Sequence, residues 1–122
     1  MALILLADDD EILCPLVEAA LQAEGHEVVL AKEGREAVAL MRKYTFDLVV
    51  MDYNMPVMTG VDAVRQARTE VAPFPPVIML TVRGDAETVQ ECLQAGARDF
   101  IVKPFEVAEL IRRIEKHLGP GA

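Results

Sequence analysis

Charged side chains stand directly after three apolar runs of the sequence. Asp8 and Asp9 follow the first run, and Asp52 follows a run near the middle of the chain. Lys103 follows the last of these runs. If the fold brings the three carboxylates within about 4 Å of one another, each pair costs roughly 4 kcal/mol at an effective dielectric near 20. Such a cluster takes up a proton or a cation, and Mg²⁺, which needs only one or two carboxylates, fits it better than Ca²⁺.

A hydroxyl side chain, Thr81, stands after a fourth apolar run. A cation, the Lys103 ammonium and this hydroxyl together could hold the oxygens of a phosphoryl group, because each offers positive charge or a hydrogen-bond donor. Asp52 is then placed to attack phosphorus as a nucleophile. The residue types therefore point to transfer of a phosphoryl group onto Asp52.

Five apolar runs alternate along the chain with five segments of helical spacing. The runs expected as strands lie at 2–7, 26–31, 46–51, 77–80 and 99–102. The expected helices lie between Ile12 and Gly25 and at 34–44, 61–71, 85–97 and 106–118. This alternation predicts an α/β fold, a single doubly wound five-stranded parallel sheet, (βα)5, with helices on both faces. The usual strand order is 2-1-3-4-5, the flavodoxin-like sheet, which opens a crevice at the carboxyl ends of strands 1 and 3.

Two residues affect where the first helix begins. Pro15 cannot donate to the carbonyl of Glu11, so this helix is expected to start late or to bend in its first turn. Asp10 is expected to cap the helix, because aspartate is favoured there and complements the helix dipole. Helix capping is also the competing explanation for Asp8 and Asp9. Capping does not explain why Asp52 and Lys103 are expected at the same edge of the sheet.

The chain has 122 residues, of which 52% are hydrophobic, and a formal net charge of −8. This length and composition favour one folded domain. The acidic balance argues against direct binding of nucleic acid, since phosphate backbones require clustered Lys and Arg. The apolar runs are too short to span a membrane and the N-terminus lacks a basic signal region, so we expect a cytoplasmic protein without membrane contact. Cys14 and Cys92 are expected to be free buried thiols, and His26 and His117 to be exposed.

Five motifs, taken in order, resemble those of a known family. They are the acidic pair in "ADD" (7–9), the aspartate in "MDYNMP" (51–56), the glycine in "TG" (59–60), the hydroxyl residue in "MLT" (79–81) and the lysine before proline in "VKPF" (102–105). With them the chain resembles the receiver domains of two-component response regulators, from Leu3 to about Leu118. The resemblance implies a receiver domain over 1–118, and "GPGA" at 119–122 is then a short tail or the start of a linker.

The resemblance implies a role for each motif residue. Asp52 is implied as the phosphoacceptor, which takes a phosphoryl group from a sensor histidine kinase or a phosphotransfer protein. Asp9 and Asp52 are implied as direct ligands of Mg²⁺, with the backbone carbonyl of Asn54 as a further ligand and Asp8 acting through water. Lys103 is implied to pair with Asp52 and later with the phosphoryl oxygens.

The resemblance also implies a switch. Thr81 turns inward to hydrogen-bond the phosphoryl group, and Phe100 follows it from an exposed to a buried rotamer. The surface of the fourth helix, fifth strand and fifth helix then changes and meets a downstream output protein or domain, and a homodimer through this surface is a further option. A cis peptide bond before Pro104 is implied as well. Such a protein is not an enzyme, beyond slow self-dephosphorylation at most.

Three residues depart from the usual pattern of the family or vary within it. Val82 stands where alanine or glycine is usual, and its larger side chain is expected to crowd the site and slow phosphoryl transfer or loss. Phe100 replaces a frequent tyrosine, so it can rotate but offers no hydroxyl to a partner. Arg83 occupies a position at which family members vary and set their rate of dephosphorylation.

Two other functions stay open at this point. Haloacid-dehalogenase-type phosphatases also use a strand-end aspartate, Mg²⁺ and a lysine, but they carry a second acid where this chain has Asn54 and need a cap and a longer chain. A flavodoxin requires a phosphate-cradling loop where this chain has acids. Within the receiver interpretation, the chain is either a single-domain regulator or the receiver of a longer protein with a DNA-binding or enzymatic output domain.

Overall fold

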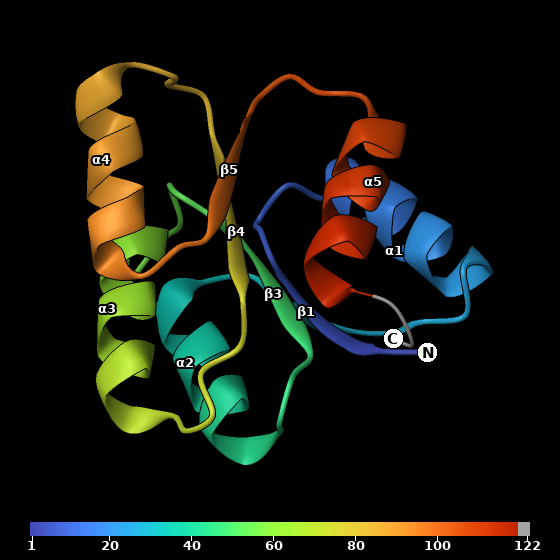
Figure 1. The fold of residues 1–122 in the computed structure, drawn as a ribbon, viewed down its shortest axis with the longest axis horizontal. Helices are drawn as coiled ribbons and strands as arrows, with labels where there is room; N and C mark the ends of the chain where they lie inside the picture. The colour runs from blue at the N-terminus through green and yellow to red at the C-terminus, as the bar shows by residue number, and fades with distance from the viewer. Residues whose placement is uncertain (120–122) are drawn as a thin grey trace.

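The computed structural model describes residues 1–119 as five strands and five helices that alternate along the chain. The strands are β1 (Leu3–Ala7), β2 (Glu27–Ala31), β3 (Leu48–Asp52), β4 (Val77–Thr81) and β5 (Asp99–Val102). They form one parallel sheet in the order β2-β1-β3-β4-β5, which confirms the predicted flavodoxin-like fold (Figure 1). Apart from Gly119, the tail expected at 119–122 lies outside the described residues.

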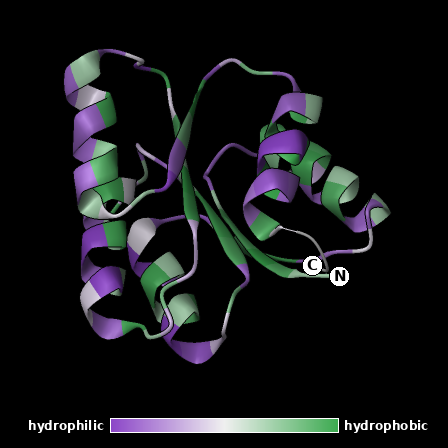
Figure 2. Ribbon diagram, in the orientation of Figure 1, coloured by the Kyte–Doolittle hydropathy of each residue, from purple (hydrophilic) through white to green (hydrophobic). Residues whose placement is uncertain are grey.

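The helices form one layer on each face of the sheet. They are α1 (Leu13–Ala23), α2 (Gly34–Lys43), α3 (Gly60–Glu70), α4 (Ala86–Ala95) and α5 (Val107–Leu118). The pair α1 and α5 covers one face, and α2, α3 and α4 cover the other (Figure 1). Apolar residues line the strands and polar residues alternate with them around the helices (Figure 2). None of the helices within 1–119 is long and apolar enough to cross a membrane.

Side chains that alternate along each strand build two separate apolar clusters. In β1, Ile4 and Leu6 belong to the cluster beneath α1 and α5, whereas Leu5 and Ala7 belong to the cluster beneath α2, α3 and α4. Every residue of β3 and β4 is buried, because both strands lie inside the sheet and have helices on both faces. The carboxyl ends of β1, β3 and β4 therefore meet at one edge of the molecule.

The start of α1 agrees with both sequence expectations. The helix begins at Leu13, one residue later than Ile12, and Pro15 lies in its first turn, where it cannot supply the N–H that would bond the carbonyl of Glu11. The carboxylate of Asp10 accepts the backbone N–H groups of Ile12 and Leu13, each at 2.9 Å. Asp10 therefore caps the helix, as predicted.

The beginning of β3 differs from the prediction, since the strand starts at Leu48 rather than at residue 46. Phe46 is buried, but it lies in the loop that precedes the strand. Its ring contacts the ring of Tyr44 edge to face, with the ring centres 6.0 Å apart. Phe46 extends the apolar run of β3 in the sequence, although it is a buried residue of the preceding loop.

The expectation that both histidines are exposed is wrong. His26 is buried, and its Nδ1 accepts the backbone N–H of Ala2 at 3.1 Å. The side chain of His117 is 12% exposed, and its Nε2 lies 2.9 Å from a carboxylate oxygen of Asp99. Both partners come from other segments of the chain, which the local sequence pattern does not reveal. The two cysteines are free and buried, as predicted.

Candidate functional site

Three carboxylates gather at the carboxyl edge of the sheet. Asp8 and Asp9 follow β1, and Asp52 is the last residue of β3, which pairs directly with β1. One carboxylate oxygen of each residue lies within 4.8 Å of those of the others. Asp8 and Asp52 are only 1% and 6% exposed, whereas Asp9 is open to solvent. The fold thus brings together the three acids that the sequence places at strand ends.

The Lys103 ammonium contacts two of these carboxylates. Its Nζ is 2.9 Å from Oδ2 of Asp8 and 3.3 Å from Oδ1 of Asp52. The backbone N–H of Lys103 donates to the carbonyl of Thr81 at 2.7 Å, which ties the lysine to the end of β4. The other oxygen of Asp8 accepts the backbone N–H of Asp10 at 2.9 Å. Both charged groups are therefore fixed by the loops that carry them.

Burial and neighbouring charges change the ionisation of this pair. The pKa of Asp52 is raised to about 6, chiefly by burial and then by the charge of Asp8, against the opposing effect of Lys103. Burial by itself lowers the pKa of Lys103, but its hydrogen bond to Asp8 and the charge of Asp52 raise that pKa above its ordinary value on balance. The lysine therefore stays an ammonium, and one positive charge faces three carboxylates.

The donors at this edge fit a hard divalent cation. The cluster consists of carboxylate oxygens alone, with no thiol or imidazole among the groups that residues 1–119 gather there. Mg²⁺ prefers oxygen ligands and is held by one or two carboxylates plus water. Asp8, Asp9 and Asp52 are the residues that would hold it. Asn54 lies on the loop after β3, two residues beyond Asp52, with its side chain exposed.

Comparison with known proteins identifies the family. The family model described as the response regulator receiver domain matches residues 4–115 of the chain. The chain belongs to this family. Transcriptional regulatory protein ZraR of Escherichia coli strain K12 is 36% identical over 116 residues, which are 95% of this chain and 26% of that protein. The receiver domain described here thus spans about a quarter of the length of this relative.

Solved structures support the same assignment. The chemotaxis protein CheY4 of Vibrio cholerae is 38% identical, with a TM-score of 0.89 over 96% of this chain and 98% of that one. The receiver domain of the sensor histidine kinase PA1611 from Pseudomonas aeruginosa PAO1 is 34% identical, with a TM-score of 0.87 over 97% of this chain and 98% of that one. That structure holds a magnesium ion in its active site cleft. The chain is a receiver domain of two-component response regulators, which sets aside the phosphatase and flavodoxin alternatives.

The hydroxyl of Thr81 is engaged with the loop after β4. Thr81 is buried at the end of the strand, and its Oγ1 donates to the carbonyl of Arg83 at 3.1 Å. The same Oγ1 accepts the backbone N–H of Arg83 at 3.0 Å. In this receiver domain the hydroxyl therefore stabilises the loop between β4 and α4.

Two further residues singled out in the sequence lie near this loop and on β5. Phe100 is half-buried and packs against the cluster beneath α2, α3 and α4. Val82 is 63% exposed and lines a hollow with Asp10, Lys103 and Phe105. Its side chain is thus beside the lysine but open to solvent, and crowding by Val82 stays a prediction. The peptide bond between Lys103 and Pro104 is cis, as the family resemblance implies.

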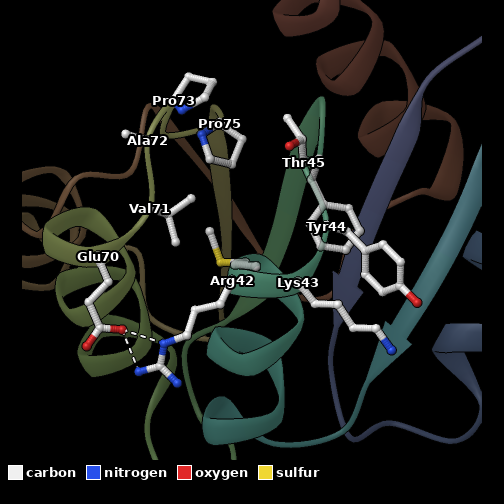
Figure 3. Close-up of a pocket in the computed structure, with 11 residues that line it drawn as sticks. Arg42, Lys43, Tyr44, Thr45, Glu70, Val71, Ala72, Pro73 and Pro75 are labelled. Carbon is white, nitrogen blue, oxygen red and sulfur yellow. Dashed lines mark hydrogen bonds and ion pairs between the residues drawn. The ribbon is translucent and has the colours of Figure 1, made fainter.

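A second hollow lies away from the acidic cluster, at the carboxyl ends of α2 and α3 (Figure 3). It encloses about 180 Å³ and is lined by Tyr44, Pro73 and Pro75 among others. Arg42 and Glu70 also line it, and Arg42 donates from Nε to Glu70 at 2.7 Å. The charged groups drawn there already neutralise each other in part, and the hollow contains none of the residues that the motifs single out.

The loop that follows Asp52 carries a strained residue, and relieving the strain should stabilise the receiver domain. Val57 has a φ of 71°, which a β-branched side chain adopts only at a cost, and it is 68% exposed. Val57→Gly should raise the free energy of unfolding by about 1 kcal/mol, since glycine tolerates positive φ. Urea denaturation measures this change. Val82→Gly, at an exposed residue for which no positive φ is found, is the control and should not stabilise.

Proposed function

We propose that this receiver domain accepts a phosphoryl group on Asp52, in a reaction that requires Mg²⁺ and draws on a phosphohistidine of a sensor histidine kinase or a phosphotransfer protein. The observation that carries the proposal is the position of the Asp52 carboxylate. It is buried at the strand end, beside the Lys103 ammonium and within the oxygen cluster of Asp8 and Asp9. Among the described residues only Asp8 shares this combination of burial, a lysine partner and two further acids, and its other oxygen already accepts the backbone N–H of Asp10.

The reaction requires an ionised Asp52 carboxylate as the nucleophile and the imidazole of the phosphohistidine as the leaving group. A carboxylate oxygen of Asp52 attacks phosphorus, an oxygen–phosphorus bond forms, and the phosphorus–nitrogen bond breaks with its electron pair left on the imidazole nitrogen. With a pKa of about 6, Asp52 is mostly ionised at neutral pH. Lys103 contacts Asp52 already and is placed to hold a phosphoryl oxygen once the bond has formed.

Asp8, Asp9 and Asp52 are the proposed Mg²⁺ residues, with the backbone carbonyl of Asn54 as a further ligand. The all-oxygen cluster supports this assignment, and the magnesium ion in the PA1611 receiver domain supports it by analogy. The bound ion would neutralise phosphoryl oxygens at a site where three carboxylates otherwise repel them. Because the Lys103 ammonium already contacts the carboxylate of Asp8, the proposed contact between Asp8 and Mg²⁺ is through water.

The response to phosphorylation is proposed to begin at Thr81. To donate to a phosphoryl oxygen, its hydroxyl must give up the carbonyl of Arg83. Phe100 would then move further into the cluster against which it packs. The surface formed by α4, β5 and α5 would change and meet an output protein or domain.

The receiver family is a signalling phosphoacceptor rather than a conventional enzyme. For this chain we propose at most slow self-dephosphorylation, a receiver unit over 1–118, a cytoplasmic location and no direct contact with nucleic acid. A homodimer through α4, β5 and α5 is a further proposed partner arrangement. Since the chain spans 26% of ZraR, the alternative is a receiver that belongs to a longer regulator with a DNA-binding or enzymatic output domain.

Incubation with Mg²⁺ and acetyl phosphate tests the proposal. Intact mass should show the gain of one phosphoryl group in the native protein and none in Asp52→Ala. Chelation of Mg²⁺ beforehand should prevent the gain. Asp62→Ala, which removes an exposed carboxylate on α3, is the matched control and should be phosphorylated normally. A gain in Asp52→Ala, or none in the native protein, would reject Asp52 as the phosphoacceptor.

Mg²⁺ should also raise the melting temperature, and Asp9→Ala should abolish the increase. Asp9 is exposed, so its removal deletes a ligand without opening a cavity in the core. Binding to the folded state stabilises by RT ln(1 + [L]/Kd), about 2.7 kcal/mol when Mg²⁺ is at 100 times its Kd. Thermal melts across millimolar Mg²⁺ measure the effect. A wild-type curve that ignores Mg²⁺ would count against the site.

A further inference from the structure

Tyr53 connects the proposed phosphoacceptor to three different elements. It follows Asp52 directly, and its backbone N–H donates to the carbonyl of Leu80 in β4 at 2.7 Å. Its carbonyl accepts the N–H of Gly60, the first residue of α3, at 2.9 Å. Its side-chain hydroxyl donates to the carboxylate of Glu91 on α4. The residue is thus fixed in the backbone near Asp52 and reaches α4 with its side chain.

Apolar packing holds α4 only weakly. The buried residues of this helix are Thr88, Cys92 and Ala95, all of them small, whereas Leu93 is 45% exposed. The buried residues of α5 include Leu110 and Ile114. The helix also lies at the end of its layer, beside α3 (Figure 1). A polar contact therefore makes up a larger share of what fixes α4 than it would for a helix with large buried side chains.

The hydrogen bond between Tyr53 and Glu91 is of the stronger, charge-assisted kind, because its acceptor is a carboxylate. It is also the main cause that raises the pKa of Tyr53 to about 12, followed by burial and the charge of Glu91. The contact therefore ties Tyr53 to α4 more firmly than a hydrogen bond between two neutral groups would.

A second connection joins the site to the first turn of α4. The Thr81 hydroxyl bonds the backbone of Arg83, and the Arg83 side chain donates from Nε to Asp85 at 3.1 Å. Asp85 caps α4 by accepting the backbone N–H of Thr88 at 3.1 Å and its hydroxyl at 2.8 Å. A movement of Thr81 toward a phosphoryl group would thus pull on the start of the helix, while Tyr53 holds its middle.

We propose that the hydrogen bond between Tyr53 and Glu91 is a latch that holds α4 in its unphosphorylated position, and that it opens when Asp52 is phosphorylated. Tyr53 then acts as a positioning residue that sets how strongly phosphorylation changes α4. This inference rests on the proposed function of Asp52. It adds a residue of this chain that determines the size of the response at the output surface.

Hydrogen exchange of the α4 amides, with and without phosphorylation, tests the latch. In the unphosphorylated protein, Tyr53→Phe should speed exchange in α4 by about fivefold, the effect of one lost hydrogen bond. In the phosphorylated protein, it should leave exchange in α4 unchanged, because the latch is already open. Intact mass of the same samples establishes the phosphorylated fraction. Glu91→Ala should give the same result, and the double variant should add nothing.

Tyr44→Phe is the matched control. This second tyrosine lies at the carboxyl end of α2 and lines the hollow there, away from Glu91 (Figure 3). Faster exchange of α4 to the same extent in both states would show a structural anchor and overturn the latch. Exchange equal to that of Tyr44→Phe in both states would overturn it as well. A native protein that gains no phosphoryl group would instead reject the proposed function and the latch with it, so the two failures are distinguishable.

Discussion

Asp52→Asn should make the metal-free protein more stable at pH 8, by about 1–2 kcal/mol or about 4–8 °C in melting temperature. The folded-state pKa of Asp52 is about 6, above the 3.8 that the unfolded chain is expected to have. The folded state therefore binds this proton more tightly, and the ionised carboxylate destabilises it. A pKa change of this size corresponds to at most about 3 kcal/mol. We expect a smaller value because solvent reaches the site at the exposed Asp9 and screens the charge of Asp52.

The sign of the pH dependence follows directly. Below about pH 4, Asp52 is protonated in both states and its contribution is fully favourable. That contribution is lost as the pH rises through about 6, so the advantage of Asp52→Asn should grow between pH 4 and pH 7 and then level off. Carboxylates with lowered pKa values, such as Asp10 and Asp99, lose their stabilising effect only on the acid side of this range.

Thermal melts in a chelator, from pH 4 to pH 8, measure the difference between the two proteins. Asp62→Asn removes an exposed carboxylate and serves as the control, with no comparable gain expected. Mg²⁺ should then stabilise the native protein much more than Asp52→Asn. If the native protein without metal is at least as stable as Asp52→Asn at pH 8, then the ionised Asp52 carboxylate does not destabilise the fold by repulsion from Asp8 and Asp9.

Gly60→Ala should destabilise the protein by about 3 kcal/mol or more, because its Cβ has no space. An added Cβ would lie 1.9 Å from the backbone oxygen of Asp52 and 2.9 Å from its carbonyl carbon. Both are backbone atoms, so no side-chain rotation relieves the contact. The end of β3 would have to move, and the Asp52 carboxylate would move with it. We therefore expect a melting temperature lower by about 10 °C and a weaker response to Mg²⁺.

Gly84→Ala provides the matched comparison. Its nearest neighbour would be a side-chain methyl of Val102 at 3.0 Å, which can shift at little cost. Its effect should stay below about 1 kcal/mol. Urea denaturation of the two variants separates the two cases, and equal losses would mean that the backbone around Asp52 yields more easily than these distances indicate.

The strand-end residues could be predicted from the sequence because they follow apolar runs. Asp8, Asp52 and Lys103 are each the first charged residue after such a run, and a parallel sheet brings these ends to one edge. The same reasoning could not predict the contact between Tyr53 and Glu91, because that contact depends on the rotation of α4 about its axis. A tyrosine beside a strand end is the only local signal for it.

The prediction that both histidines are exposed was wrong for a related reason. His26 precedes a strand and His117 ends an amphipathic helix, and both positions are commonly exposed. Their burial depends on Ala2 and Asp99, which lie 24 and 18 residues away. The hydroxyl of Thr81 is a similar case, since its bond to Arg83 depends on the conformation of the loop rather than on the residue types. Sequence order located the strand ends, but side-chain partners required the folded chain.

The two apolar clusters have a consequence for how such a chain can change. Because the sheet lies between them, side chains beneath α1 and α5 share no cluster with those beneath α2, α3 and α4. Substitutions at sites without shared partners add in their free energies. Packing on one face can therefore drift over generations without disturbing the other. A lineage of such proteins can repack the layer that contains α4, while the opposite layer keeps the domain folded.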